Sequence, residues 1–335
     1  MMPTPSHSLQ GQSVLVLGLG ASGYAMARWA ARCGARVTVA DTRAEPPQLA
    51  ALREHLPEAR FVSGALEATL VAGGVQAVFR SPGLSPQQVT PLLTAARQAG
   101  VPVSGELGLF TQALADLKAQ RDYAPTVLAI TGTNGKTTVT ALAGQLVERA
   151  GRRTAVAGNI GPTLLDTLSE KLDADELPQV WVIELSSFQL EGEEHFEPTA
   201  AAVLNLTQDH LDWHGSMTSY AQAKARVFGQ RGLMVLNRED PLVMNMLPQP
   251  LKVKGGKFRQ REFMTFGADM PARPGDYGIE VVNGMAWLVR ALEADETRRQ
   301  RSAEAEEVHI QRLMPADALR IRGRHNAVNA LAALA

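Results

Sequence analysis

The sequence predicts an α/β protein with mostly parallel sheets, and three observations support this fold class. Short runs of β-branched and other apolar residues alternate along the chain with Ala- and Leu-rich stretches of helical length. Glycine-rich loops stand at two of the strand-to-helix turns, at residues 18–23 and 132–138. Strands that alternate with helices are typical of doubly wound sheets, and such loops are typical of phosphate sites. We therefore expect a Rossmann-like N-terminal domain followed by a P-loop-type, ATP-binding α/β domain.

Length and composition exclude several other classes. The chain has 335 residues, with 33 basic and 34 acidic side chains and a formal net charge of −1. A dedicated nucleic-acid binder usually carries a strong basic excess, so no nucleic acid is expected as a partner. The single cysteine, Cys33, leaves no intramolecular disulfide and no cysteine-based zinc site. No signal peptide or membrane-spanning apolar run is visible, so we expect a cytoplasmic monomer with no membrane partner.

The elements of the first third follow one another as strands and helices. Gly34 and Gly100 each follow a predicted helix, where glycine commonly forms the C-terminal cap. The polar stretch 118–125 has few apolar residues and is the best candidate for a linker. Strands are predicted at 14–17, 36–40, 61–62, 75–79 and 101–103, and helices at 24–33 and 91–99.

A second α/β unit follows the linker. A helix is predicted from the second glycine loop to Ala150, and Asn283-Gly284 is a strong hairpin signal between strands 279–282 and 285–289. The charge-rich segment 291–307 is nearly free of apolar residues and predicts a solvated loop. The other strands are predicted at 126–130, 155–157, 180–184, 200–206 and 233–236.

The first glycine loop, residues 18–23, has the pattern G-x-G-x-x-G between a strand and a helix. Asp41 ends the next predicted strand, 21 residues beyond Gly20. Such a turn lets the backbone and the helix N-terminus approach a diphosphate closely. The motif leaves open whether that diphosphate belongs to NAD, FAD or a nucleotide sugar, and a turn that only packs helix on sheet is the alternative.

The second loop, residues 132–138, is the stronger signal because Gly135-Lys136-Thr137 has the form of a P-loop end. Backbone amides of such a loop cradle phosphates, the lysine meets the terminal phosphates and the threonine hydroxyl can ligate Mg²⁺. Ile130 stands where the full pattern has glycine, so this loop is shorter than usual. A dehydrogenase has no use for an ATP loop, whereas an ATP-driven enzyme can hold a nucleotide-linked substrate in its first domain.

Four motifs together resemble the Mur ligase family, over essentially the whole chain. They lie at residues 132–138, 184–190, 209–214 and 323–329. The resemblance implies an ATP-dependent ligase that adds an amino acid to a UDP-linked peptidoglycan precursor through an acyl phosphate. The runs 41–43 and 81–83, with Asn134 where the L-alanine-adding branch usually carries His, favour the branch that adds D-glutamate to UDP-N-acetylmuramoyl-L-alanine.

The resemblance also implies a domain organisation. We expect a UDP-sugar domain at 1–117, a linker at 118–125, the central ATP domain at 126–322 and the start of a third domain at 323–335. We expect the rest of that third domain, which helps to hold the incoming amino acid, to be missing, because the chain stops in the apolar run 331–335. Alternatives are a nucleotide-binding fragment without catalysis, folylpolyglutamate synthase or another amide ligase, and an NAD-dependent oxidoreductase. The first domain argues against the folate enzyme, and the P-loop against the oxidoreductase.

Roles for the residues of the ATP site follow from the same resemblance. Asp209, Asp212 and His214 are expected beside the metal ligands. Without the resemblance, Glu184 would be a solvated strand-end carboxylate and Lys224 an exposed helix lysine. The resemblance implies four catalytic residues, Lys136, Glu184, His210 and Lys224. It implies two Mg²⁺ ions, held by Thr137, Glu184, His210 and, if it is carbamylated, Lys224. It implies that ATP is bound by Gly132, Thr133, Asn134, Gly135, Lys136, Thr137, Thr138, Asn326 and Asn329.

The UDP-sugar is expected in the crevice at the carboxyl ends of the first strands. The alternative for Ser186 is a polar side chain that only satisfies the backbone at a strand end. The resemblance implies that Gly20, Ala21 and Ser22 contact the diphosphate and that Asp41, Thr42 and Arg43 contact the uridine. Ser81, Pro82 and Gly83 are expected to line the same crevice. Asn159, Ser186 and Gln189 are expected to contact the sugar-peptide.

Overall fold

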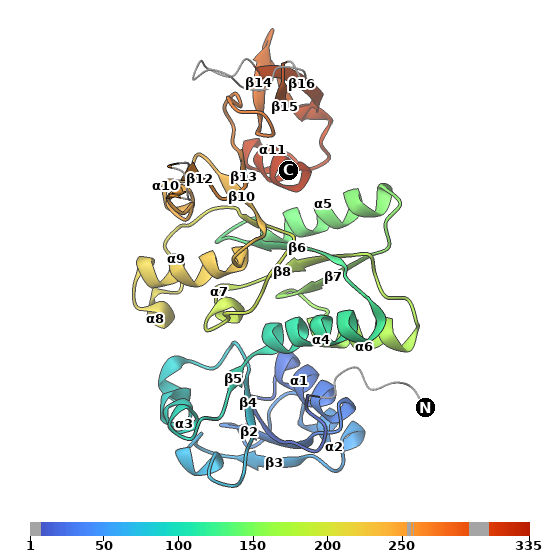
Figure 1. Ribbon diagram of the computed structural model, residues 1–335, viewed down its shortest axis with the longest axis vertical. Helices are drawn as coiled ribbons and strands as arrows, with labels where there is room; N and C mark the ends of the chain where they lie inside the picture. Colours follow the sequence, from blue (N-terminus) through green and yellow to red (C-terminus); the bar gives the residue numbers. More distant parts are fainter. Residues whose placement is uncertain (1–7, 253–255, 257, 295–307) are drawn as a thin grey trace.

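The computed structural model describes residues 8–252, 256, 258–294 and 308–335, and it confirms the α/β fold class. A five-stranded sheet has the order β3-β2-β1-β4-β5, and a nine-stranded sheet has the order β16-β15-β14-β13-β10-β9-β6-β8-β7. The two sheets and their helices follow one another along the long axis of the molecule (Figure 1). Strands β14–β16 and helix α11 form the end farthest from the first sheet (Figure 1).

The first sheet is parallel throughout and is built largely from the predicted strands. Strand β1 is buried because Val14 and Val16 belong to one hydrophobic cluster, with residues of α1, and Leu15 and Leu17 to another, with residues of α3. Helix α2 was not predicted, since only Leu49 and Leu52 of its residues are buried and the periodic signal is weak. The elements are β1 (Ser13–Leu17), α1 (Ala21–Arg32), β2 (Arg36–Asp41), α2 (Leu49–His55), β3 (Arg60–Ser63), a 3₁₀ turn (Ala68–Leu70), β4 (Ala77–Arg80), α3 (Pro86–Gln98), β5 (Val103–Ser104) and α4 (Glu106–Arg121).

The second sheet has a parallel part and an antiparallel extension. Strands β7, β8, β6, β9, β10, β13 and β14 pair in parallel, whereas β14, β15 and β16 are antiparallel. The predicted hairpin is present, with positive φ at both Asn283 and Gly284. The first elements are β6 (Thr126–Thr131), α5 (Lys136–Arg149), β7 (Thr154–Gly158), α6 (Leu164–Asp173), β8 (Val180–Glu184), α7 (Ser187–Leu190), β9 (Ala200–Val203), α8 (Leu211–His214), α9 (Met217–Ala225) and a 3₁₀ turn (Arg226–Phe228). Then come β10 (Leu233–Asn237), α10 (Pro241–Met244), β11 (Leu251–Lys252), β12 (Phe258–Arg259), β13 (Phe263–Phe266), β14 (Tyr277–Val282), β15 (Met285–Glu293), β16 (Val308–Pro315), a 3₁₀ turn (Ala316–Ala318) and α11 (Arg324–Leu334).

Two sequence-based expectations about loops were wrong in part. Helix α4 continues to Arg121, so the first half of the expected linker 118–125 is helical. The helix extends this far because Leu117 is fully buried, which anchors its last turns. Ala291 is also fully buried and belongs to β15, so the expected solvated loop 291–307 begins later than predicted. Residues 295–307 of that segment lie outside the described residues.

Helices and charged pairs join the two sheets. Helix α6 of the second unit packs against α1 and α4. Arg28 and Arg32 of α1 form ion pairs with Asp166 (3.1 Å) and Asp173 (2.8 Å) of α6. In the parts of the chain that the structure describes, no helix is long and apolar enough to cross a membrane.

Gly23 provides a test of how closely the first helix packs on its sheet. A Cβ atom added at Gly23 would overlap the carbonyl oxygen of Gly18, whereas one added at Gly20 would meet nothing within 4 Å. Because backbone atoms cannot yield cheaply, we expect Gly23→Ala to lower the free energy of unfolding by about 2 kcal/mol or more. Urea unfolding followed by circular dichroism measures this, with Gly20→Ala as the matched control. Equal stability of the two variants would contradict the packing role of Gly23.

Candidate functional site

The second glycine loop lies between β6 and α5, as predicted. Gly135 caps the helix with φ +85°, a conformation that favours glycine. The Nζ atom of Lys136 donates hydrogen bonds to the carbonyl oxygens of Gly132 (3.0 Å) and Thr133 (2.9 Å). Burial lowers the pKa of Lys136, while Glu184 and Asp209 act in the opposite direction. The lysine thus lies over its own loop, where a phosphate would be cradled.

Asn205, which the sequence analysis missed, clamps this loop from the end of β9. Its Oδ1 accepts the amide of Asn134 at 2.8 Å, and its Nδ2 donates to the Asn134 carbonyl at 3.0 Å. The backbone of Asn205 also accepts the amide of Thr133 at 2.9 Å. In the sequence, Asn205 could have been found from its position just after the apolar strand β9. That strand pairs with β6, which leads into the phosphate loop.

Glu184 ends β8 and is 2% exposed, so it is not the solvated carboxylate that was the alternative. Its Oε2 accepts a hydrogen bond from the Thr137 hydroxyl at 3.1 Å, and its Oε1 accepts one from Asn159 at 3.1 Å. Gly158 lies beside it in β7, and an added Cβ there would overlap the Glu184 carbonyl oxygen. The carboxylate is therefore held next to the phosphate loop by residues of two neighbouring strands and a helix.

Lys224 of α9 is 2% exposed, which excludes the exposed helix lysine. Its Nζ donates to the Thr131 hydroxyl (3.2 Å) and to the Gly132 carbonyl (2.8 Å), at the start of the phosphate loop. The same nitrogen lies 4.9 Å from the ring centre of Tyr220. Burial and the nearby charge of Lys136 lower the pKa of Lys224 to about 7, so a large fraction of this amine is neutral near neutral pH.

The histidine segment lies across the same opening. His210 has a left-handed backbone (φ 52°), and its ring is 3.3 Å from the carboxylate of Asp209. His214 instead shares a hydrogen bond of 2.9 Å between its Nε2 and the Ser187 hydroxyl. Phe188 contacts both imidazoles, with ring centres 4.7 Å from His210 and 5.7 Å from His214. The two histidines are therefore grouped around Phe188, which the sequence analysis did not single out.

These side chains enclose a small cavity of about 110 Å³. The cavity brings together residues from the phosphate loop, β7, α7, the histidine segment and α9. Glu184 is hydrogen-bonded to one of its walls through Asn159. The lining is formed by Thr133, Lys136, Asn159, Ser186, Ser187, Phe188, Asp209, His210, Tyr220 and Lys224.

The donor set next to the cavity fits one Mg²⁺ ion better than two. Thr137 and Glu184 supply the hard oxygen atoms that Mg²⁺ prefers, and they already lie in contact. The amine of Lys224 is a hydrogen-bond donor in its cationic form and cannot ligate a cation. Among the described residues, no group of three or more His, Cys, Asp and Glu side chains is arranged to hold a metal.

Helix α11 brings the predicted asparagines to the phosphate loop. A Cβ on Gly135 would lie 2.7 Å from Oδ1 of Asn329, so this side chain rests directly on the loop. Asn329 also donates to Asn326 at 3.3 Å, and Asn326 donates to the Arg322 carbonyl at 2.7 Å. The two side chains share one face of the helix, as their spacing predicted.

The first glycine loop is held by Asp41, which is 1% exposed. Its carboxylate accepts the Leu19 amide (2.7 Å) and two side-chain hydrogen bonds from Arg43 (2.8 and 2.7 Å). Burial acts to raise the pKa of Asp41, but the hydrogen bonds from Arg43 and Leu19 hold it below its ordinary value. Ser81 is also buried and donates to the Gly18 carbonyl at 3.1 Å. Thr42, Arg43 and Gly83 are exposed beside them.

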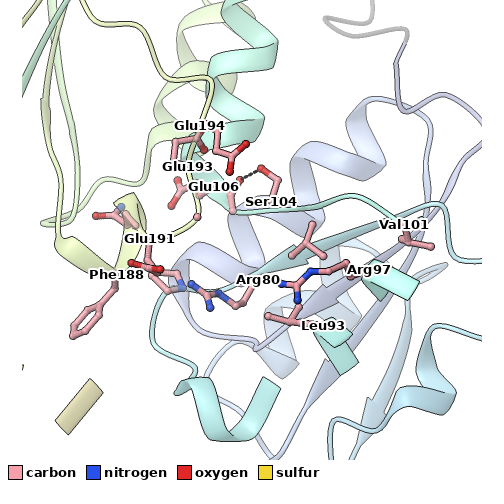
Figure 2. Close-up of a pocket in the computed structure, with 15 residues that line it drawn as sticks. Arg80, Leu93, Arg97, Val101, Ser104, Glu106, Phe188, Glu191, Glu193 and Glu194 are labelled. Atoms are coloured by element: carbon pink, nitrogen blue, oxygen red, sulfur yellow. Dashed lines mark hydrogen bonds between the residues drawn. The ribbon is translucent and has the colours of Figure 1, made fainter. Parts of the chain in front are cut away.

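Ser186 and Gln189 form reciprocal hydrogen bonds at the start of α7. The Ser186 amide donates to Oε1 of Gln189 at 3.0 Å, and the Gln189 amide donates to the Ser186 hydroxyl at 3.3 Å. This pair of hydrogen bonds is a capping box, and it is the alternative role of Ser186, a polar side chain that binds the backbone at a strand end. Ser186 also lines the small cavity, and Gln189 lines a larger one of about 370 Å³ at the carboxyl ends of β4 and β5 (Figure 2).

The larger cavity lies where the first sheet meets the second unit. The Arg80 guanidinium, at the end of β4, lies 5.7 Å from the ring centre of Trp213 in α8. Figure 2 shows Arg80 reaching toward Glu191 and Phe188, which belong to the second unit. The carboxyl edge of the first sheet therefore faces the segment that carries the two histidines.

Together, a short P-loop with a buried acidic partner and a second glycine loop define a nucleotide-binding α/β protein. Residues 130–335 match the Mur ligase middle domain, and residues 12–105 match a domain described as Mur ligase MurD-like, N-terminal. The chain belongs to the Mur ligase family.

Relatives in three bacteria carry the name UDP-N-acetylmuramoylalanine–D-glutamate ligase. The protein of Albidiferax ferrireducens is 70% identical over 330 residues, which are 98% of this chain and 65% of the relative. That of Polaromonas sp. is 54% identical and is covered to 70%, and that of Burkholderia mallei is 54% identical and is covered to 66%. This chain thus spans about two thirds of the length of these relatives.

A solved structure agrees with the fold. The UDP-N-acetylmuramate:L-alanyl-gamma-D-glutamyl-meso-diaminopimelate ligase from Neisseria meningitides is similar with a TM-score of 0.53 and 16% identity. The similarity covers 97% of this chain and 92% of that one. At this identity, the likeness supports the arrangement of sheets and helices alone.

His214 provides a test of the electrostatics of the site. Burial, followed by the positive charges of Lys224 and His210, lowers the pKa of His214 to about 4. We expect its imidazole to stay neutral from about pH 5 to 8, whereas an unperturbed histidine titrates near 6.5. Nuclear magnetic resonance of ¹⁵N-labelled histidines measures this, with His214→Asn to identify the signal. A midpoint between about 6 and 7 would refute the lowered pKa.

Proposed function

We propose that this chain carries the UDP-sugar and ATP sites of a ligase that adds D-glutamate to UDP-N-acetylmuramoyl-L-alanine. The observation that carries the proposal is the small cavity, where Lys136, His210 and Lys224 meet beside the Thr137–Glu184 pair. Phosphoryl transfer to a carboxylate needs groups that neutralise phosphate charge and a carboxylate that can hold Mg²⁺, and this region has both. The proposal is supported by the identity of 54 to 70% to relatives with that name.

The reaction joins a carboxylate and an amine, and oxide is a poor leaving group. ATP would donate its γ-phosphoryl group to the L-alanyl carboxylate, and the amine of D-glutamate would then displace phosphate from the acyl phosphate. Phosphoryl transfer depends mainly on alignment and charge neutralisation. Lys136 would neutralise the terminal phosphates, and the amides of residues 132–138 would orient them. His210 would lie beside the acceptor carboxylate.

Mg²⁺, when bound, would neutralise phosphate charge and align the reacting oxygens. Thr137 and Glu184 would hold the first ion. His210 and a carbamylated Lys224 would hold the second. Members of the Mur ligase family generally use ATP and Mg²⁺. The number of Mg²⁺ ions is part of our proposal.

The remaining assignments complete the proposal. Residues 1–117 would hold the UDP-sugar, 126–322 would hold ATP, and 118–125 would connect them, with 323–335 leading into a third domain. The exposed Thr42, Arg43 and Gly83 would meet the ligand directly, whereas Asp41 and Ser81 would shape the loop. Asn159, Ser186 and Gln189 would meet the sugar-peptide, and Asn326 and Asn329 the adenosine. We expect a cytoplasmic monomer whose product enters peptidoglycan synthesis, and hence cell-wall growth and division.

The activity is tested by ADP release, measured with protein expressed from the complete coding sequence. We expect release to require both UDP-N-acetylmuramoyl-L-alanine and D-glutamate. Because Lys136 neutralises charge that develops on the transferred phosphoryl group, Lys136→Ala should lower the rate by about 100-fold or more. The exposed Lys118 provides the control, since Lys118→Ala should leave the rate unchanged.

Each outcome of this assay discriminates among the alternatives. Release that depends on L-alanine or on a folate instead of D-glutamate would overturn the substrate assignment. Nucleotide binding without turnover by this chain, tested in the same assay, would support the alternative of a nucleotide-binding fragment without catalysis. In a separate titration with a nicotinamide cofactor, an absorbance change on binding would favour the oxidoreductase.

Lys224 provides an independent test of the second metal position. Its neutral amine can attack CO₂, which forms an N–C bond, releases one proton and leaves an anionic carbamate. We expect a carbamate ¹³C resonance from protein in ¹³C-bicarbonate near pH 8, because the pKa of Lys224 is about 7. The resonance should be lost in Lys224→Arg and retained in Lys118→Arg. A spectrum without it in the unmodified sequence would exclude the modification.

A further inference from the structure

The pairing of β9 with β6 continues beyond the ends of both strands. The Leu204 amide donates to the Thr131 carbonyl, and the Thr133 amide donates to the Asn205 carbonyl, each at 2.9 Å. Bonds that alternate between two chains in this way are typical of a parallel ladder. The phosphate loop, which follows β6, is therefore hydrogen-bonded to the segment 204–210, which leads from β9 to the first histidine of the site.

The side chain of Asn205 extends this ladder by one residue of the loop. Its amide group accepts the Asn134 amide at 2.8 Å and donates to the Asn134 carbonyl at 3.0 Å. The N–H and C=O groups of one residue belong to two successive peptide planes. A single side chain therefore fixes the orientation of two peptide planes in the phosphate loop.

Thr133 adds a second link between the loop and the same segment. Its hydroxyl accepts the Thr207 amide at 3.1 Å and donates to the Thr207 carbonyl at 3.3 Å. The Tyr220 hydroxyl lies 3.1 Å from the same oxygen and can donate to it. A hydroxyl group has one proton and can accept two hydrogen bonds, so these three contacts use it completely.

The segment is also held from its other side. Leu206 is 4% exposed, and its amide donates to Oδ2 of Asp240 at 2.6 Å. The same carboxylate caps α10. Shortly after Thr207 the chain reaches His210, which lines the same small cavity as Lys136. A movement of the loop relative to this segment would therefore change the position of Lys136 relative to His210.

We propose that Asn205 is a positioning residue that fixes the phosphate loop relative to His210, acting through Asn134 and without contact to ATP or the acceptor. The inference rests on the proposed function, in which Lys136 meets the phosphoryl donor and His210 lies beside the acceptor carboxylate. Two reacting groups must be aligned closely, and a displacement of about 1 Å can lower a rate by about 100-fold. No bond to Asn205 forms or breaks in the reaction.

Asn205→Ala removes both side-chain bonds to Asn134 and leaves the backbone bonds in place. In protein expressed from the complete coding sequence, with ADP release as the assay, we expect kcat to fall by about 10- to 100-fold. KM for ATP and for UDP-N-acetylmuramoyl-L-alanine should stay nearly unchanged, because the groups proposed to bind each nucleotide remain. A structural role alone would lower the stability without this difference between kcat and KM.

Asn237 provides the matched control at the end of the neighbouring strand β10. Its Nδ2 donates to the Leu204 carbonyl at 2.8 Å, and its Oδ1 accepts the Glu239 amide at 3.0 Å. Asn237→Ala thus also removes two hydrogen bonds of one asparagine, but neither partner belongs to the phosphate loop. We expect a lower midpoint of urea unfolding in both alanine variants and an unchanged kcat in Asn237→Ala.

Thr133 keeps the proposal testable if Asn205→Ala does not fold, as checked by circular dichroism. Thr133→Val preserves the β-branched shape and loses the link to Thr207, so kcat should fall. Thr133→Ser, which retains the hydroxyl, should recover most of that loss. Because Asn205 and Thr133 fix the same loop, the double variant Asn205→Ala/Thr133→Val should lose less activity than the product of the two single losses.

The outcomes separate this role from the proposed function. An unchanged kcat in Asn205→Ala, an equal fall of kcat in Asn237→Ala, or fully multiplicative losses in the double variant would overturn the role of Asn205 and leave the proposed function intact. If the unmodified complete protein releases no ADP with both substrates present, the proposed function is refuted and the role of Asn205 with it.

Discussion

The buried carboxylate of Glu184 is the interaction on which the site depends. It lies at the end of β8, between the Thr137 hydroxyl and the Asn159 amide. Together with Asp209, it counteracts the lowering of the pKa that burial causes at Lys136 and Lys224. A buried cation without a partner is costly, so these two acidic groups stabilise the charged forms of Lys136 and Lys224 in this region. The absence of a Cβ on Gly158 lets β7 approach β8 closely enough to supply Asn159. Sheet register and site electrostatics are therefore set by the same pair of strands.

The sequence predicted those parts of the site that one strand and the turn after it position. The loop 132–138, Thr137 and Glu184 belong to this class, because each follows a buried apolar run and parallel strands end at a common edge. Burial of Lys224 was not predictable from local pattern, since it arises from packing of α9 against a loop about 90 residues earlier. Asn205 and Phe188 were missed for a similar reason, because their contacts join separate segments. Helices α2 and α4 lacked a clear apolar period, so the elements around the first sheet were predicted only in part.

Several polar residues predicted at the ligand sites have partners within the protein. Asp41 accepts hydrogen bonds from Leu19 and Arg43, and Ser186 is hydrogen-bonded to Gln189. Such bonds fix the loops in shape before a ligand arrives, which lowers the entropy that binding must remove. At Asp41 the same hydrogen bonds from Arg43 and Leu19 outweigh burial and hold its pKa below the ordinary value.

The bonds of Lys136 to the carbonyls of its own loop give the phosphate site a further property. The ammonium group already has two acceptors, at 3.0 and 2.9 Å, so a phosphate must compete with them. Capture of the nucleotide is then an exchange of hydrogen bonds, in which the gain is the stronger attraction of a charged oxygen over a neutral carbonyl. An uncharged molecule of similar shape has no such advantage. The loop thereby discriminates by charge before any contact with the base or the sugar is made.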